Sequence, residues 1–197
     1  MKLRRGTFLL VAVGAAGLVG CGSVEGEAAG GASTSVAAEP AAFHFESGDL
    51  ALGEFDPHTI GGNLFDPCAE ISDEEFAAVG LARADNAVSA KDREGLRACQ
   101  LRSDSPYVVE GIVANAVTRD MVASQTELLD GFSNGVVPGL FVYLEEPMGD
   151  DTCTAAVETN RGSLSASVME IQPDASTETR CTRATEIMEA LYLLARG

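Results

Sequence analysis

The chain has 197 residues, a formal net charge of −17 and no tryptophan. This length suits one domain with extensions, because single domains usually span about 100 to 200 residues. So acidic a chain repels phosphate groups and anionic lipid headgroups, which disfavours nucleic-acid binding and membrane binding through a basic patch. Solubility is the ordinary consequence of the charge, and recruitment of cations is the alternative.

Residues 1–20 have the three-part pattern of an export signal peptide. One lysine and two arginines open the chain, an apolar run follows over residues 8–19, and small residues precede Cys21. The apolar run is too short to remain as a membrane-spanning helix. Removal of this leader leaves 10 basic against 30 acidic residues, so the mature protein is more acidic still.

The segment Leu18-Val19-Gly20-Cys21 resembles the bacterial lipobox, in which the cysteine thiol receives a diacylglycerol and the leader is removed just before it. We therefore expect Cys21 to be the first residue of the mature lipoprotein and to carry the lipid, including palmitate. Each buried methylene contributes about 0.8 kcal/mol, so two or three acyl chains would hold the protein firmly at the extracytoplasmic face of the cell membrane. An ordinary secretory leader with a chance cysteine is the alternative.

Residues 21–63 are predicted to be a flexible tether and an irregular arm. Residues 22–42 are mostly small or polar and offer almost nothing large to bury. Residues 43–64 are richer in apolar side chains but are interrupted by Gly, Asp and Pro, and a short edge strand over 43–45 is one reading of them. The globular domain is predicted over 64–197.

The predicted elements of this domain alternate between helices and strands. Ser72 and Glu75 form a capping-box pattern, and apolar residues at spacings of three and four predict an amphipathic C-terminal helix over 184–194. The turn Asn160-Arg161-Gly162 predicts a hairpin. In chain order the expected elements are a helix over 73–79, strands over 96–102 and 107–117, a helix over 119–128, strands over 136–144, 152–159 and 163–171, and the C-terminal helix.

Most connections are too short for parallel crossovers. We therefore expect an α+β fold: an antiparallel sheet of about five strands with helices packed on it, and two disulfides.

Four cysteines remain besides Cys21, and an even number outside the cytoplasm favours two disulfides. Zinc is disfavoured because the gaps of 31, 54 and 28 residues lack the close cysteine pairs of structural zinc sites. Three pairings are open. The layout of the elements favours the sequential one, in which each bridge joins a helix end to the sheet: Cys68 with Cys99, and Cys153 with Cys181.

Several motifs together resemble the actinobacterial lipoproteins grouped as domain of unknown function 3558. They are Phe65-Asp66-Pro67-Cys68, Gly95-Leu96-Arg97-Ala98-Cys99, Asp151-Thr152-Cys153-Thr154, Asn160-Arg161-Gly162 and Arg180-Cys181. The resemblance covers about residues 64–197 and implies an envelope lipoprotein with paired disulfides. It implies no activity and no catalytic residues. One departure is Gln100, which occupies a position that is often Trp in such proteins.

No catalytic, metal, cofactor or nucleic-acid motif stands out in the sequence. The two histidines, His44 and His58, precede the predicted domain, so a Ser-His-Asp or Cys-His site cannot form within it. Residues 145–151 lack the spaced loop of an EF-hand, and no Gly-Lys-Ser/Thr follows the glycines of 131–139. The carboxylates of Asp73-Glu74-Glu75 are interpreted as a helix start. The remaining pairs and the glycines are interpreted as turns: Glu145-Glu146, Asp150-Asp151, Gly131, Gly135 and Gly139.

The sequence therefore favours a non-catalytic binding module for a small envelope ligand, a lipid or a peptide, with no cofactor. Two groups of residues are candidates for the lining of its pocket. They are the aromatic residues Tyr107, Tyr143, Tyr192, Phe132 and Phe141, and the small residues Ser163, Ser165, Ser167, Ala155 and Ala156 along one sheet face. For the aromatic residues, a place in the core is the favoured interpretation. The alternative is an accessory protein that docks onto another envelope protein through an edge strand or an apolar patch. An enzyme, such as an unrecognised hydrolase, is the least favoured class.

Overall fold

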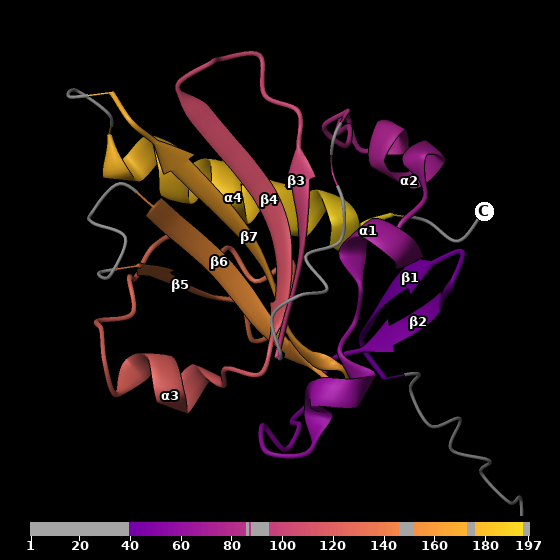
Figure 1. Cartoon of the computed structure of the whole chain (residues 1–197). Coiled ribbons are helices and arrows are strands. Elements are labelled where there is room, and N and C mark those ends of the chain that lie inside the picture. The colour runs from indigo at the N-terminus through magenta and orange to yellow at the C-terminus, as the bar shows by residue number, and fades with distance from the viewer. Residues whose placement is uncertain (1–39, 86, 88–94, 146–151, 173–175, 195–197) are drawn as a thin grey trace, which may run out of the picture. The chain divides into compact units, whose positions relative to one another are not determined.

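The computed structural model describes residues 40–85, 87, 95–145, 152–172 and 176–194 (Figure 1). All of them belong to one unit of the chain, Ala38–Gly197. The predicted signal peptide, Cys21 and the tether up to residue 39 lie outside the described residues. Within the described part, no helix is both long and apolar enough to cross a bilayer.

A five-stranded antiparallel sheet forms the centre of the fold, in the order β3-β4-β7-β6-β5. It confirms the predicted α+β class and strand number. The strands are β3 (Leu96–Leu101), β4 (Val108–Asn115), β5 (Phe141–Leu144), β6 (Thr152–Thr159) and β7 (Gly162–Glu170).

Strand β5 begins at Phe141, five residues later than the sequence predicts. The residues before it are apolar enough to suggest a strand, but Pro138-Gly139 turns the chain. Gly139 has a φ of +78°, and the Leu140 amide donates to the Val137 carbonyl at 3.2 Å. The turn therefore takes the backbone out of the ladder until Phe141.

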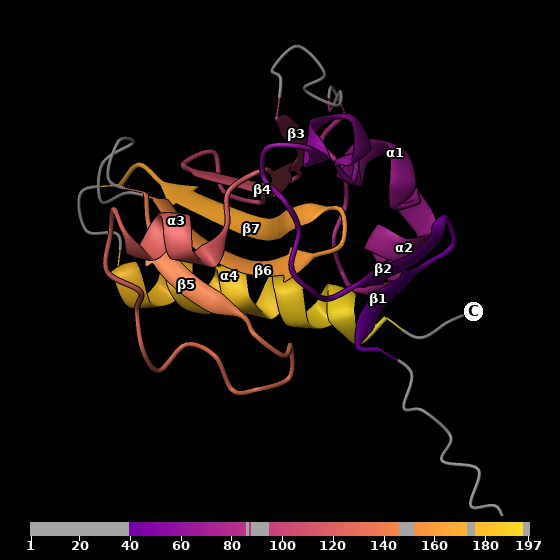
Figure 2. The ribbon, with the colours of Figure 1, turned by 90° about the horizontal axis from the view of Figure 1, so that it is seen from below.

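Helix α4 (Thr177–Tyr192) covers one face of the sheet along β6 and β7 (Figures 1 and 2). The helix begins at Thr177, earlier than the start at residue 184 that the apolar spacing predicts. The Ser176 hydroxyl accepts from the Thr179 amide and caps the helix there. The apolar side chains of α4 are fully buried against the sheet: Cys181, Ala184, Ile187, Met188 and Leu191. Full burial of each large one contributes about 1.5 to 3 kcal/mol.

The short helix α3 (Arg119–Ala123) belongs to the opposite face, where Val122 packs on Phe141 and Ala156. The sequence predicts this helix to run to residue 128. Instead, Leu128 bridges to Tyr143, and the amide of Leu129 donates to Val142 at 2.8 Å. Helix α3 ends early because the residues after it bond to backbone groups at the open edge of β5.

Three short helical segments precede the sheet: η1 (Ile60–Asn63), α1 (Pro67–Glu70) and α2 (Asp73–Ala78). The predicted capping box is present at α2, since the Ser72 hydroxyl accepts from the Glu75 amide and the Glu75 carboxylate accepts from the Ser72 amide. Asp66 caps α1 by accepting from the Ala69 amide at 3.3 Å.

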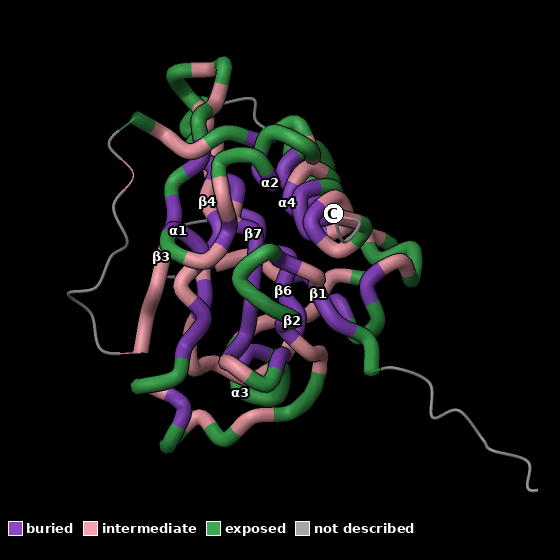
Figure 3. The backbone as a smooth tube through the Cα atoms, turned by 90° about the vertical axis from the view of Figure 1, so that its right-hand side faces the viewer, coloured by how far each residue is buried: buried purple, intermediate pink, exposed green. Residues whose placement is uncertain are grey.

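The segment predicted as an irregular arm contains a regular hairpin, β1 (Ala42–Phe45) and β2 (Gly48–Ala51). Its first strand matches the strand considered at 43–45. Phe43, Phe45 and Leu50 are buried in the main core, as the purple trace of β1 in Figure 3 indicates. The packed core therefore starts well before residue 64. Alternation along β1 turns both phenylalanines inward.

Both disulfides have the sequential pairing that the layout favours. Cys68–Cys99 joins α1 to β3, and Cys153–Cys181 joins β6 to α4, with Cα–Cα distances of 4.9 and 5.1 Å. Each bridge closes a loop of about thirty residues, which contributes on the order of 3 to 4 kcal/mol by restricting the unfolded chain.

Candidate functional site

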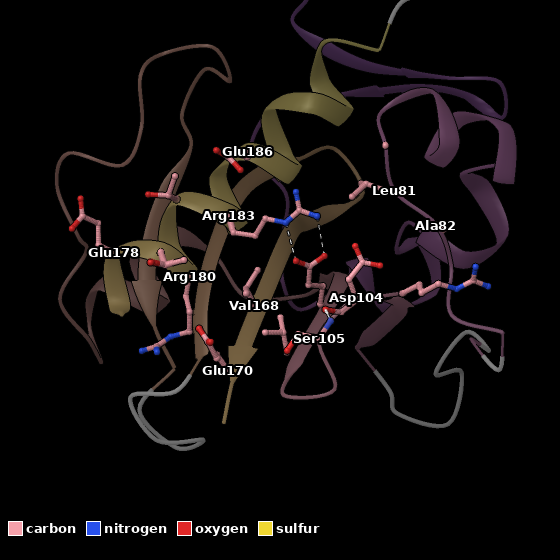
Figure 4. A pocket seen from close by; sticks show the side chains of 17 residues that line it. Leu81, Ala82, Asp104, Ser105, Val168, Glu170, Glu178, Arg180, Arg183 and Glu186 are labelled. Carbon is pink, nitrogen blue, oxygen red and sulfur yellow. Dashed lines mark hydrogen bonds and ion pairs between the residues drawn. The ribbon is translucent and has the colours of Figure 1, made fainter. Parts of the chain in front are cut away.

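An open groove of about 830 Å³ lies beside the N-terminal half of α4 (Figure 4). Its walls come from four parts of the chain: α4 itself, the paired ends of β4 and β7, the turn over 102–105, and residues 80–82 after helix α2. We call it the α4 groove. Its volume lies in the range of small-molecule sites, about 300 to 1,000 Å³.

Local hydrogen bonds fix the turn that forms one wall. The Ser103 hydroxyl accepts from the Ser105 amide at 3.2 Å, and the Ser105 hydroxyl accepts from the Tyr107 amide at 3.3 Å. The adjoining wall is tied to β3, because the Arg102 amide donates to the Ala82 carbonyl at 2.8 Å. These serines favour such turns because their hydroxyls bond nearby backbone amides.

A bidentate ion pair lies inside the α4 groove. The Nε and Nη2 atoms of Arg183 donate to the two carboxylate oxygens of Glu110 at 2.8 and 3.0 Å, as the dashed lines in Figure 4 mark. Glu110 is 7% exposed, whereas Arg183 is half-buried. The hydrogen bonds that Arg183 donates to Glu110 raise the pKa of Arg183, so the guanidinium stays charged. The pair ties α4 to β4 and presents the edge of a guanidinium to the groove.

Charged side chains of both signs surround this pair. Five acidic and three basic residues line the groove. Arg102 pairs with Asp85 at the rim. Apolar contact surface is supplied by Leu81, Val108 and Val168. A lining of this kind suits a ligand that carries polar and charged groups together with some apolar surface.

The predicted aromatic pocket does not exist as one site. Tyr107 is 51% exposed, Tyr192 packs edge-on against Phe43 at 5.4 Å, and Phe141 stacks on Tyr143 at 6.0 Å. Phe141 and Tyr143 lie on the sheet face opposite α4. The five aromatic residues are therefore not gathered at one pocket, and Phe141, with Tyr143 packed beside it, belongs to a buried cluster, as the interpretation of these residues as core side chains expects.

The predicted row of small residues is only partly on one face. The register places Ser163, Ser165, Ser167 and Ala156 together, but Ala155 points to the α4 face. Ser163, Ser165 and Ala156 are buried, and none of these small residues lines the α4 groove. These small residues therefore allow close packing instead of lining a groove.

Neither histidine lies at the α4 groove. His44, on β1, bonds Asp49 on β2 at 2.8 Å, and His58 is an exposed loop residue. The glycines Gly131, Gly135 and Gly139 all have positive φ, as turn glycines do.

The acidic clusters likewise have structural roles where they are described. Asp73 bonds Arg83, which lowers the pKa of that carboxyl, and Glu75 caps α2. Glu145 accepts from the Thr154 hydroxyl at 2.6 Å. Residues 146–151, and with them most of the segment considered for calcium, lie outside the described part. No group of three or more His, Cys, Asp and Glu residues in the described ranges could hold a metal ion.

Sequence reasoning missed Glu110 and Arg183. A signal for Glu110 was present, because Glu110, Ile112 and Ala114 alternate along one strand and the last two are apolar, which places the carboxylate on the buried face. A carboxylate there requires a cation or hydrogen-bond donors as its partner. The sequence contains no local signal for which arginine supplies it, because 73 residues separate the two.

A family model described as "Protein of unknown function (DUF3558)" matches residues 16–192. This range includes both disulfides and every residue that lines the α4 groove. Neither the curated proteins nor the solved structures contain a match to the chain.

Proposed function

The chain belongs to the family DUF3558, proteins of unknown function, and we propose that it is a non-catalytic, lipid-anchored binding module of an actinobacterial cell envelope. Two features of the chain support this proposal. The lipobox pattern ending at Cys21 supplies the anchor, and the α4 groove supplies a place for a ligand. The groove is the observation that carries the binding role.

A peptide is the ligand class that suits the groove best. A lipid tail would leave the Arg183–Glu110 pair and the other charged side chains without water or polar partners, which is costly. A peptide brings amide groups and charged side chains that can satisfy both signs, while Leu81 and Val168 offer apolar contact. The ligand proposed here is therefore a short peptide segment of an envelope component.

The chemistry of the described groove lining supports a binding role over catalysis. The described groove lining contains serine and threonine hydroxyls but no histidine or cysteine. The carboxylate best placed to act as a base, Glu110, is already held by both donors of Arg183. Such a base would have to give up a buried ion pair before it could accept a proton.

The lipid anchor is tested by cell fractionation of the variant Cys21→Ala. We expect the native chain in the membrane fraction and the variant in the soluble extracytoplasmic fraction, since the acyl chains supply the attachment. Retention of the variant on the membrane would rule out Cys21 as the anchor.

The groove is tested by native mass spectrometry of the full chain purified from the envelope, before and after denaturation. A bound peptide predicts an extra mass that is reproducible and that denaturation releases. A bare chain from every preparation would count against a stably held ligand.

An accessory role in docking is the second candidate, and an exposed apolar patch favours it. Tyr107, Val109 and Ile171 are 51%, 43% and 60% exposed. They lie together on the face away from α4, where the Ile171 amide donates to the Tyr107 carbonyl at 3.0 Å. Site-specific photocrosslinking from Val109 in intact cells should yield one envelope protein repeatedly if this patch docks; crosslinks to none would remove the docking role.

A further inference from the structure

The guanidinium of Arg183 has one edge that binds Glu110 and a second edge that has no partner. Its Nε atom and one hydrogen of Nη2 face the Glu110 carboxylate, at 2.8 and 3.0 Å. Within the part of the chain that the structure describes, Arg183 makes no other hydrogen bond, so Nη1 and the second hydrogen of Nη2 remain available as donors. In Figure 4 the nitrogen without a dashed line points away from the ion pair.

A ligand in the α4 groove can reach this outer edge. The side chain of Arg183 is 39% exposed, against 8% for Glu110, and Arg183 lines the groove. Its Nη1 atom lacks a partner among the described residues and yet is not buried, so solvent has access to it. Because Glu110 already fixes the plane of the guanidinium, little further freedom is lost when the outer edge donates as well. The outer edge is therefore a pre-oriented set of donors.

The charges around Arg183 decide which acceptor this edge can hold. The hydrogen bonds to Glu110 raise the pKa of Arg183, burial opposes them, and the negative charges of Glu110 and Glu186 raise it further. One positive charge is thus already shared between two carboxylates. A ligand carboxylate would bring a third negative charge, whereas an uncharged carbonyl oxygen accepts the same hydrogen bonds without that repulsion.

This inference rests on the peptide ligand proposed above. The main-chain carbonyl oxygens of a peptide are uncharged acceptors, and its C-terminus carries a carboxylate. We propose that Arg183 anchors the ligand by donating from Nη1 and Nη2 to a main-chain carbonyl group, so that the α4 groove takes an internal segment of a peptide and not its C-terminal end. Glu110 is the positioning residue that orients the guanidinium.

Two libraries of random acetylated tripeptides serve as probes, one with amidated C-termini and one with free carboxylates. These peptides are short enough that the terminal group lies close to every carbonyl. An equal mixture is incubated with the full chain in detergent, and the bound peptides are separated by size exclusion and identified by mass spectrometry. We expect amides to exceed acids about tenfold among the bound peptides, because like charges brought together weaken binding.

Two substitutions test the two residues separately. Arg183→Lys keeps a cation beside Glu110 but lacks the planar fork that donates from both edges, so the amount of bound amide should fall about tenfold. Glu110→Gln removes one of the two negative charges that share the guanidinium. The ratio of bound amide to bound acid should therefore fall about tenfold, a change of preference that a merely structural Glu110 would not produce.

Arg119→Lys is the matched control for the arginine substitution. Arg119 lies over the ring of Phe141 at 6.0 Å and does not line the α4 groove, so binding should be unchanged. Melting temperatures of all variants show whether they fold.

The possible failures are distinguishable. If the native chain binds neither library, the peptide-binding function is wrong and the anchor with it. If the native chain binds acids as well as amides, if Arg183→Lys binds as the native chain does, or if Glu110→Gln leaves the ratio unchanged, the proposed anchor is wrong while peptide binding stands.

Discussion

Gly162 shows how one residue joins the sheet to the segment before it. It opens β7 with a φ of +96°, and a Cβ atom there would lie 2.7 Å from the Asn115 carbonyl oxygen and would collide with the Leu64 side chain. The position therefore requires glycine twice over, for backbone conformation and for space. The hairpin turn predicted from Asn160-Arg161-Gly162 is present, because glycine permits the positive φ at position 162.

Gly162→Ala should lower the free energy of unfolding by about 3 kcal/mol, the sum of a left-handed backbone penalty and steric overlap. Chemical denaturation measures this loss. Gly135→Ala is the matched control, because Gly135 has a φ of +84° but nothing within 4 Å of the new Cβ atom. It should cost only about 1 kcal/mol. Equal losses in the two variants would show that the contacts at Gly162 are unimportant.

Tyr143 gives a prediction at alkaline pH. Burial, with the nearby negative charge of Glu145, raises the pKa of its phenol above the usual value near 10. Above pH 10 the unfolded chain loses this proton while the folded chain keeps it, so stability falls as pH rises toward the folded pKa. The limiting slope is about 1.4 kcal/mol per pH unit.

Tyr143→Phe removes this titration. Between pH 10 and 11.5 the variant should lose stability less steeply than the native chain, as measured by denaturant unfolding at each pH. Identical slopes would mean that the phenol ionises equally in both states.

The residues that sequence analysis identified best were those whose chemistry is local. The capping pair Ser72 and Glu75 and the turn glycine Gly162 act on neighbours in the chain, so their types and spacing indicate their roles. Glu110 and Arg183 were missed because their pairing depends on how α4 lies across β4. A candidate site assembled from distant elements leaves no such local pattern.

At the scale of elements, Glu75 links α2 to the first hairpin. Its Oε2 accepts from the Ser72 amide at 2.8 Å, and its Oε1 accepts from the Glu46 amide at 2.7 Å. Glu46 lies in the turn between β1 and β2. One buried carboxylate therefore fixes both a helix start and the position of the hairpin.

Glu75→Ala should cost about 3 kcal/mol, because two charge-assisted hydrogen bonds are lost. Ser72→Ala should cost about 1 kcal/mol, the usual cost of losing a helix cap. Thermal unfolding followed by circular dichroism compares them. Glu74→Ala serves as control, since that neighbour is exposed and should cost less than about 1 kcal/mol. A loss at Glu75 no larger than at Ser72 would disprove the link to the hairpin.

Element types were predicted more accurately than element lengths. Strands β6 and β7 match their predictions closely, because their residues pair with neighbours over their whole length. Helix α3 is shorter than predicted, since Leu128 contributes a bridge to β5 that a sequence pattern cannot reveal. Apolar spacing indicates that a side chain is buried, but not whether its backbone is better bonded in a helix or at a sheet edge.

For the whole molecule, the first hairpin belongs to the core. Phe43 is fully buried and contacts Tyr192 near the end of α4, so the beginning and end of the described chain pack together. The sequence predicted only an irregular arm here, because residues 43–64 are interrupted by turn formers and Tyr192 lies more than a hundred residues away in the chain.

Phe43→Ala should destabilise the chain by about 3 to 5 kcal/mol, as is usual when a buried aromatic side chain is truncated. Phe55→Ala, in a half-buried position of the same segment, should cost less than about 2 kcal/mol. Denaturant unfolding measures both. A stable, cooperative fold in a chain that begins at residue 64 would contradict the role assigned to the hairpin.

Peptide binding in the α4 groove is tested most directly by native mass spectrometry of three full-length chains from the same envelope preparation. They are the native chain, Ala82→Trp and Ala123→Trp. Ala82 lines the groove and Ala123 does not, and both side chains are exposed, so the same bulky substitution obstructs the groove in one variant only. We predict a releasable peptide mass on the native chain and on Ala123→Trp, and its loss from Ala82→Trp. Retention of the same mass by Ala82→Trp, or its absence from all three chains, would contradict the proposed function.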